Sequence, residues 1–209
     1  MTRMLCGLLA ALWLGIGLAA EAPPDVLART TTDEVLAILR ADKEIQSGNS
    51  RKVYELVEAK ILPHFNFSRM TRLAVGQPWR QASPAQQEAL TSHFRTLLVY
   101  TYANALTSYR NQMVEYRPLK MAADDTEVEV RSLIKQPTGG DPIDVNYSME
   151  KTDKGWKVYD VKIAGVSIVQ NYRCNFAAEI QKGGVDGLIA TLAAKNKTLM
   201  QQAGQAPRK

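Results

Sequence analysis

The first half of the chain, from about residue 32 to residue 110, places apolar side chains three and four residues apart, the spacing of amphipathic helices. Thr31 and Glu34 have the spacing of a capping box, which predicts that the first helix starts there. Ser83 begins a second capping box with proline at the first helical position. The stripe that follows it is the longest in the chain, so we expect a central helix over 84–110.

Between residues 113 and 163 the period falls to two, which is typical of strands with one wet face and one buried face. One set of alternating positions, apolar except for Ser132, consists of Val128, Val130, Ser132, Ile134, Ile143, Val145, Tyr147 and Met149. Turn residues separate the runs, at 124–125, 138–141 and 153–155. The pattern predicts a four-stranded antiparallel curved meander.

The segment from Trp156 to Phe176 departs from this alternation, because it presents apolar groups on almost every face. It is a predicted strand that turns at Gly165 into a helix. One interpretation is a strand buried on both sides that leads into a core helix. The other is that some of these side chains line a cavity for an apolar ligand. The residue pattern alone does not separate the two.

Two further helices are expected over 166–202, divided at Gly183 and Gly184. The order of helices, meander and helices predicts an α+β fold with the N-terminal and C-terminal helices packed on one face of the sheet. The length of the mature chain suits one domain with a sizeable core, over residues 32–202. We expect a flexible linker over 21–31 and a polar tail over 203–209.

Residues 1–20 have the features of a secretory signal peptide: a basic start at Arg3, an uncharged apolar run and small residues before a cleavage site after Ala20. The apolar run is short for a membrane span. Without this peptide only Cys174 remains, and we expect it to be a buried thiol rather than part of a disulfide framework.

The formal charge of +5 falls to +4 when Arg3 is removed, and the basic residues are dispersed. A nucleic-acid-binding stripe is therefore not expected.

Few residues point to catalysis. His64 and His93 are the only histidines, and neither has a cysteine or second histidine at a metal-ligand spacing, so no metal site is expected. No nucleophile elbow, phosphate loop or dinucleotide fingerprint is present. Asp160, in a largely apolar strand, is a candidate base of a small cone-shaped isomerase or hydrolase-like enzyme. That function stays open as an alternative.

Three segments of the chain carry distinctive combinations of residues: LAVGQPWRQASP at 73–84, the segment 156–176 with GVSIVQNYR inside it, and GVDGLIATLAAKN at 184–196. Together they resemble the MlaC family, the periplasmic phospholipid-binding component of the Mla lipid-transport system, also known for toluene tolerance. The resemblance covers about residues 32–202. It implies a non-enzymatic carrier with no cofactor, which holds phospholipid as its ligand in an apolar cavity between sheet and helices.

The resemblance also implies partners: an outer-membrane lipoprotein and porin complex, and an inner-membrane MCE-domain protein of an ABC transporter. We expect a periplasmic monomer that helps to maintain outer-membrane lipid asymmetry. From the apolar pattern we expect the cavity to be lined by Leu98, Tyr102, Leu106, Val128, Val130, Val145, Tyr147, Met149, Val158, Val161, Val166 and Val169. Lys162 and Arg173 are candidate contacts for the head group. A cavity-less module that binds an envelope partner is the second open alternative.

Overall fold

A computed structural model describes residues 22–204 except Arg110 and Thr138. The predicted signal peptide and the last residues of the predicted tail lie outside the described residues. No helix in the described part of the chain has both the length and the hydrophobicity to cross a membrane. The helices before the sheet are α1 Pro24–Ala41, α2 Lys43–Gln46, α3 Ser50–Leu56, the π-helix η1 Val57–Ile61, the 3-10 helix η2 Leu62–His64, α4 Phe67–Val75, the 3-10 helix η3 Gln77–Arg80, α5 Pro84–Tyr102 and α6 Asn104–Thr107.

Helix α1 begins well before the predicted position. Pro24 occupies its first turn, where the missing N–H of proline costs no helical hydrogen bond, and Asp25 adds a carboxylate beside the positive end of the helix dipole. Thr31 and Glu34 therefore lie inside the helix and do not cap it. The flexible linker predicted over 21–31 is wrong from Pro24 onward, because helix α1 already begins there.

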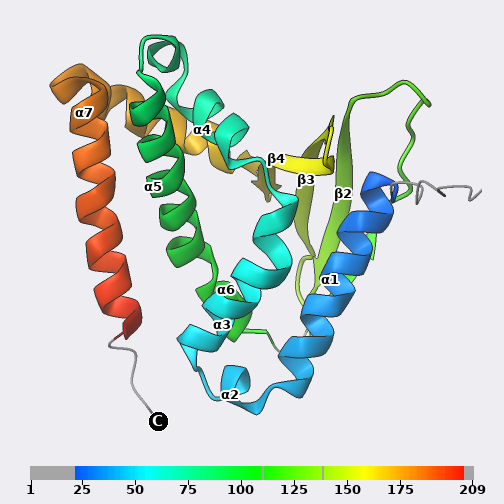
Figure 1. The fold of residues 1–209 in the computed structure, drawn as a ribbon. Helices are drawn as coiled ribbons and strands as arrows, with labels where there is room; N and C mark the ends of the chain where they lie inside the picture. Colours follow the sequence, from blue (N-terminus) through cyan, green and yellow to red (C-terminus); the bar gives the residue numbers. More distant parts are fainter. Residues whose placement is uncertain (1–21, 110, 138, 205–209) are drawn as a thin grey trace, which may run out of the picture.

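The capping box at α5 is confirmed. The Ser83 hydroxyl accepts a hydrogen bond from the backbone N–H of Gln86, and the Gln86 side chain accepts one from the N–H of Ser83. The helix ends at Tyr102, earlier than predicted, and the short α6 continues the chain toward the sheet. In Figure 1, α5 runs between the C-terminal part of α7 and the remaining helices.

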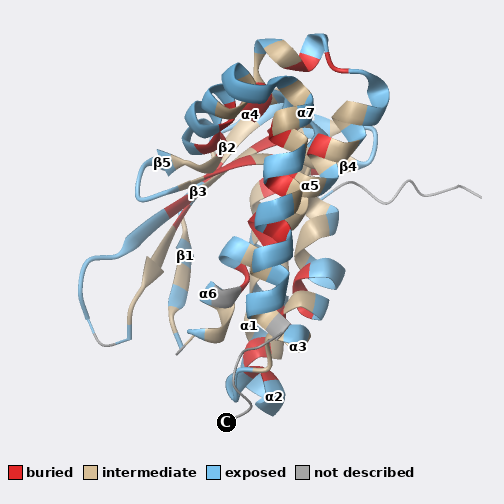
Figure 2. Cartoon of the chain, turned by 90° about the vertical axis from the view of Figure 1, so that its left-hand side faces the viewer, coloured by how far each residue is buried: buried red, intermediate tan, exposed pale blue. Residues whose placement is uncertain are grey.

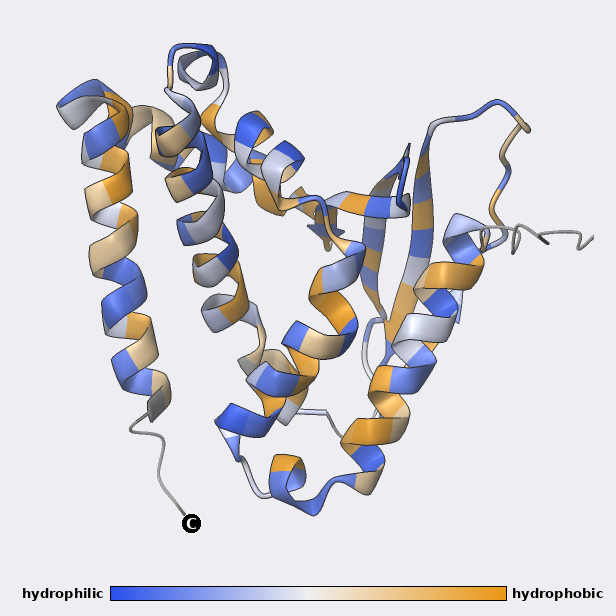
Figure 3. Ribbon diagram, in the orientation of Figure 1, coloured by the Kyte–Doolittle hydropathy of each residue, from blue (hydrophilic) through white to orange (hydrophobic). Residues whose placement is uncertain are grey.

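In the described part of the chain the sheet has five antiparallel strands in sequence order: β1 Met113–Tyr116, β2 Glu127–Lys135, β3 Ile143–Thr152, β4 Gly155–Ile163 and β5 Val166–Ser167. The predicted meander is confirmed for β1 to β4. β5 is a two-residue addition at Val166–Ser167, which were predicted to be helical, and it pairs with the end of β4. Alternation of apolar and polar residues along β2 and β3 is visible in Figure 3.

A β-bulge in β4 explains why Trp156–Ile163 did not alternate. Ser148 pairs with Asp160 and Met149 pairs with Val158, so Tyr159 has no partner on β3. One extra residue reverses which side chains face inward. Val158 and Val161, three residues apart, therefore both face the helices, and the segment carries apolar groups at both odd and even positions.

Helix α7, Ile168–Gly204, contains the break predicted from its glycines. Gly184 has φ 67° and ψ −166°, outside the helical region, so the element consists of two helical segments joined at a kink. Tyr172 and Phe176 are buried against α5, where they form edge-to-face contacts with Phe94. Cys174 lies two residues from each of them, on the opposite side of the helix, and is exposed; the expectation of a buried thiol is wrong.

Buried apolar residues form three clusters. The first joins α4, α5 and α7 around Phe94, the second joins α1, α2, α3 and the end of α5 around Val53, and the third lies on the inner face of the sheet around Met149. Figure 2 shows that exposed residues cover the outer sides of the helices. The contacts between the sheet cluster and the helix clusters are made mostly by half-buried residues, so the interior is incompletely closed there.

A polar network joins α4 to the sheet. The Arg69 guanidinium donates to Glu150 (2.5 Å) and to Glu127 (2.7 Å), and it lies 3.7 Å from the centre of the Tyr159 ring. Tyr159 donates to Glu127, and Asn66, the N-cap of α4, donates to Glu150. The unpaired residue of the bulge thus forms part of the contact that fixes α4.

We predict that Glu150→Ala lowers the free energy of unfolding by about 1.5–3 kcal/mol, because Arg69 loses a charge-assisted hydrogen bond in a partly buried site. The two side chains are only 17% and 16% exposed. The matched control is Glu55→Ala, whose Arg51 partner is 87% exposed; it should cost no more than about 0.5 kcal/mol. Chemical denaturation of both variants measures the difference, and equal costs would contradict the role of the network.

Candidate functional site

Two apolar pockets lie between the sheet and the helices. Pocket 1, of about 220 Å³, is enclosed by α1, the segment η1–η2, α6 and the inner face of the sheet. Pocket 2, of about 320 Å³, lies beside it toward α4, α5 and the start of α7. The walls of both are almost entirely hydrocarbon. Side chains of the three core clusters form part of these walls but leave the space between them open.

The two pockets share part of their walls. Ile61, Phe65, Leu106, Ile134 and Tyr147 line both of them. These residues come from the helical layer and from β2 and β3, so the pockets lie next to each other across the interface of the two layers. All five are half-buried rather than core residues.

Hydroxyl groups of α1 and the sheet interact at the edge of pocket 1, which Thr32 and Tyr147 line and beside which Tyr116 lies. Tyr116 donates to the carbonyl oxygen of Ala28 (3.0 Å), and its hydroxyl lies 2.6 Å from that of Thr32. Burial raises the pKa of Tyr116. Burial also raises the pKa of Tyr147, whose hydroxyl interacts with those of Tyr116 and Ser132. Both tyrosines are therefore neutral donors at physiological pH, and the Tyr116 contacts attach α1 to β1.

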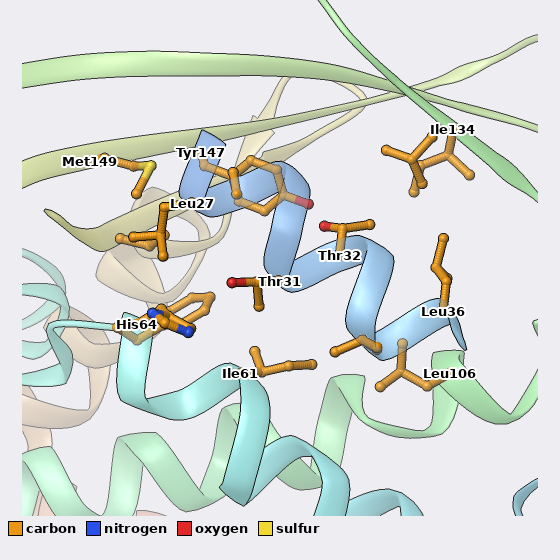
Figure 4. Close-up of a pocket in the computed structure, with 15 residues that line it drawn as sticks. Leu27, Thr31, Thr32, Leu36, Ile61, His64, Leu106, Ile134, Tyr147 and Met149 are labelled. Carbon is orange, nitrogen blue, oxygen red and sulfur yellow. The ribbon is translucent and has the colours of Figure 1, made fainter. Parts of the chain in front are cut away.

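His64 is a residue of pocket 1 whose ordinary pKa lies close to neutral pH. It lies at the end of η2, half-buried, and Figure 4 shows its imidazole beside Thr31, Leu27 and Ile61. Its pKa is lowered, first by burial and then by the positive charge of Lys157, while Glu34 acts in the opposite direction. Lys157 reaches this region by donating to the carbonyl oxygen of Pro63 (2.8 Å). The imidazole is accordingly neutral near pH 7.

The structure brings eight of the twelve predicted lining residues to the two pockets. They are Leu98, Tyr102, Leu106, Val145, Tyr147, Met149, Val158 and Val161. Their contact with a ligand stays a prediction.

The other four predicted residues do not line either pocket. Val128 and Val130 face inward but pack within the sheet cluster. Val169 is 1% exposed and belongs to the cluster between α5 and α7. The largest difference from the prediction is at Val166, which was expected to line the cavity and is 61% exposed. It pairs with Ile163 at the end of the sheet, beyond the cover of the helices.

Neither basic residue proposed for the head group lines pocket 1 or pocket 2. Lys162 pairs with Glu129 on the outer face of the sheet, 2.5 Å away. Arg173 is exposed on α7, and its guanidinium lies 3.5 Å from where a Cβ at Gly76 would stand.

Several lining residues were missed by the sequence pattern. Helix α1 contributes Leu27, Thr31 and Val35, a stripe at four-residue spacing that a helix starting at Pro24 would have indicated. The segment around His64 and Phe65 carries no such periodicity. It reaches the pocket because Phe65 forms a bridge with Val158 at the open edge of β4.

Asp160 has a structural role. Its carboxylate accepts hydrogen bonds from the backbone N–H groups of Val161 and Val169 (2.9 and 3.1 Å) and from the Ser167 hydroxyl (2.5 Å). It therefore caps the start of α7 and ties it to β4. It lines neither pocket, which removes the basis for Asp160 as a base acting on a ligand there. Among the described residues no group of three acidic, histidine or cysteine side chains is placed to hold a metal.

Most of the chain matches a known protein family. The family model described as "MlaC protein" matches residues 29–194. The chain belongs to the MlaC family. The resemblance noted in three segments thus extends across α1 to α7 and includes the elements that enclose both pockets.

Relatives and a solved structure agree with this membership. The family member from Haemophilus influenzae, the intermembrane phospholipid transport system binding protein MlaC, is 29% identical over 190 residues, 90% of this chain and 85% of its own. Toluene tolerance protein ttg2D from Pseudomonas putida is 30% identical, covering 99% and 96%. A phospholipid-binding protein from Ralstonia solanacearum, solved in complex with a phospholipid, superposes with a TM-score of 0.79 at 42% identity, covering 86% and 99%. Membership of the MlaC family identifies the chain as a lipid-binding transport protein and not an enzyme.

We predict that His64 makes stability depend on pH. The unfolded chain protonates this histidine near its ordinary pKa of 6.5, whereas the folded protein protonates it only at lower pH. The unfolded state thus binds more protons in that window, so stability falls as the pH drops below about 6.5. His64→Gln should lessen this loss, as measured by denaturation between pH 7.5 and 5. An NMR titration placing the His64 pKa above 6.5 would contradict the prediction.

Proposed function

We propose that this chain is a periplasmic phospholipid carrier. It shields acyl chains in pockets 1 and 2 and shuttles lipid between the outer-membrane and inner-membrane complexes of the Mla system, which maintains outer-membrane asymmetry. The observation that carries the proposal is the pair of adjoining apolar pockets between sheet and helices. It is supported by the similarity to a protein solved with a phospholipid.

The physical requirement of such a carrier is to keep hydrocarbon from water. Each buried methylene contributes about 0.8 kcal/mol, so two unshielded acyl chains would not leave a bilayer at a useful rate. A charged head group has the opposite requirement, because burying an unpaired charge is unfavourable. The hydrocarbon walls of pockets 1 and 2 suit the chains, and the head group stays in solvent.

The proposed partners are those that the resemblance to the family implies. A complex of lipoprotein and porin in the outer membrane would supply or receive lipid, and the MCE-domain protein of an ABC transporter would do so at the inner membrane. The predicted signal peptide at residues 1–20 is consistent with a periplasmic location. We propose that the carrier acts as a monomer, since the same pockets must be offered to each complex in turn.

Protein purified from bacterial cells should contain phospholipid. We expect solvent extraction followed by mass spectrometry to release diacyl phospholipid in a fixed ratio to protein, because the apolar pockets would otherwise stand open to water. Native mass spectrometry measures the same ratio without extraction. Material that stays free of lipid even after incubation with phospholipid vesicles would contradict the proposed function.

A charge within pocket 2 should expel the ligand. Val145 is 9% exposed and lines this pocket, so Val145→Glu places a carboxylate against the acyl chains and should lower lipid content about tenfold or more. Leu106→Trp, which fills space at the wall common to both pockets, should lower it without adding charge. Native mass spectrometry measures the lipid content.

The matched control is Val166→Glu. Val166 carries the same side chain at the end of the same sheet, but it is 61% exposed and lies outside both pockets. This variant should retain wild-type lipid. Circular dichroism and denaturation confirm that each variant is folded, and folded Val145→Glu and Leu106→Trp proteins with full lipid content would overturn the assignment of the cavity.

A further inference from the structure

Pocket 1 differs from pocket 2 in the polar groups that reach it. Thr31, Thr32, His64 and Tyr147 line pocket 1, whereas the polar side chains lining pocket 2 are the hydroxyl-bearing Tyr102 and Tyr147. Figure 4 shows Thr31 and Thr32 on one helix, with His64 and Tyr147 on the two sides of the same cavity. Polar groups from α1, η2 and β3 therefore interrupt the otherwise hydrocarbon walls of pocket 1.

Two of these groups have no partner in the described part of the chain. Thr32 is engaged with Tyr116, but no hydrogen bond joins the Thr31 hydroxyl or the His64 imidazole to another described residue. Helical position does not explain this for Thr31, since its neighbour Thr30 bonds back to the carbonyl oxygens of Val26 and Leu27. Both unpaired groups are half-buried and face the cavity.

Filling pocket 1 with acyl chains would leave the Thr31 hydroxyl and the His64 imidazole without hydrogen-bond partners. Water solvates them while the cavity is open, but acyl chains displace that water and offer no acceptor along their methylenes. A buried polar group without a partner is unfavourable. The threonine hydroxyl is a donor, and neutral imidazole has one N–H donor. The part of a phospholipid that provides uncharged acceptors next to the acyl chains is the pair of ester carbonyls.

We propose that Thr31 and His64 form a polar subsite that binds the ester carbonyls joining the acyl chains to the glycerol of the lipid. This rests on the proposed function and adds an orientation to it. The glycerol region lies in pocket 1, between α1 and η2, and acyl chains extend past Tyr147 into pocket 2. The phosphate is then on the side of Lys157, whose ammonium group binds the carbonyl oxygen of Pro63 next to His64.

The test compares two lipids that differ only in their carbonyl groups. Delipidated protein is offered a diacyl phosphatidylglycerol or the dialkyl ether analogue of equal chain length, and affinity is measured by competition. We expect the diester to bind about two- to tenfold more tightly, the effect of one or two hydrogen bonds. The double variant Thr31→Val with His64→Leu should bind the two lipids equally and bind the ether lipid at least as well as the wild type does.

Thr30→Val is the matched control, since Thr30 is the exposed neighbour of Thr31 on α1 and lines neither pocket, so this variant should keep the preference for the ester. Equal binding of both lipids by the wild type would overturn the subsite, and so would a preference that survives in the double variant. A free fatty acid whose binding depends on Thr31 and His64 as strongly as the diester does would show that the subsite binds a carboxylate, which also overturns the proposal. Failure of the protein to bind either phospholipid would instead overturn the proposed function.

Discussion

The structure depends on a mismatch between the apolar inner face of the sheet and the helices that cover it. Three separate clusters form instead of one core, and the sheet cluster meets the helix clusters through half-buried side chains such as Phe65, Ile134 and Tyr147. Close packing normally removes such spaces, because every unfilled volume forfeits dispersion contacts. Here the spaces are retained, and their walls are hydrocarbon. A fold of this size can afford two open pockets only if its other contacts are well made.

Two polar arrangements supply contacts of that kind. Asp160 accepts hydrogen bonds from Val161, Ser167 and Val169, which joins β4 to the start of α7. Arg69 joins α4 to β2 and β3 through Glu127 and Glu150. Both arrangements lie beside the bulge at Tyr159. They hold α4 and α7 at the sheet from the side of the first cluster, so the space on the side of α1 does not have to be closed for the layers to stay in place.

Helix α1 closes pocket 1 by different means. Its contact with β1 includes the hydroxyl groups of Thr32 and Tyr116 and the carbonyl oxygen of Ala28, in addition to apolar contacts of Leu27 and Ala28 with the sheet. The polar groups in and beside pocket 1 thus have two roles that are distinguishable in the structure. Thr32 and Tyr116 connect protein to protein, whereas Thr31 and His64 face the cavity without a partner among the described residues. Thr31 and Thr32, which are neighbours on α1, thus have one role each.

The sequence by itself determined the order of elements, the meander, the start of α5, the break at Gly184 and most of the sheet and α5 residues that reach the pockets. These follow from local rules, since a side chain on a strand or helix has its face set by the period of the element. Local rules also misplaced the start of α1 and therefore missed Thr31, because the capping-box spacing of Thr31 and Glu34 occurs here inside a helix that begins at Pro24.

The division between lining and core was decided only by the tertiary structure. Val145, Val166 and Val169 belong to the same apolar pattern, yet one lines pocket 2, one is exposed at the end of the sheet and one is packed against α5. Their difference depends on where the helices end and on the bulge that reverses β4. Hydrophobicity determines that a side chain avoids water, but the position of distant elements determines whether protein or an empty space stands in front of it.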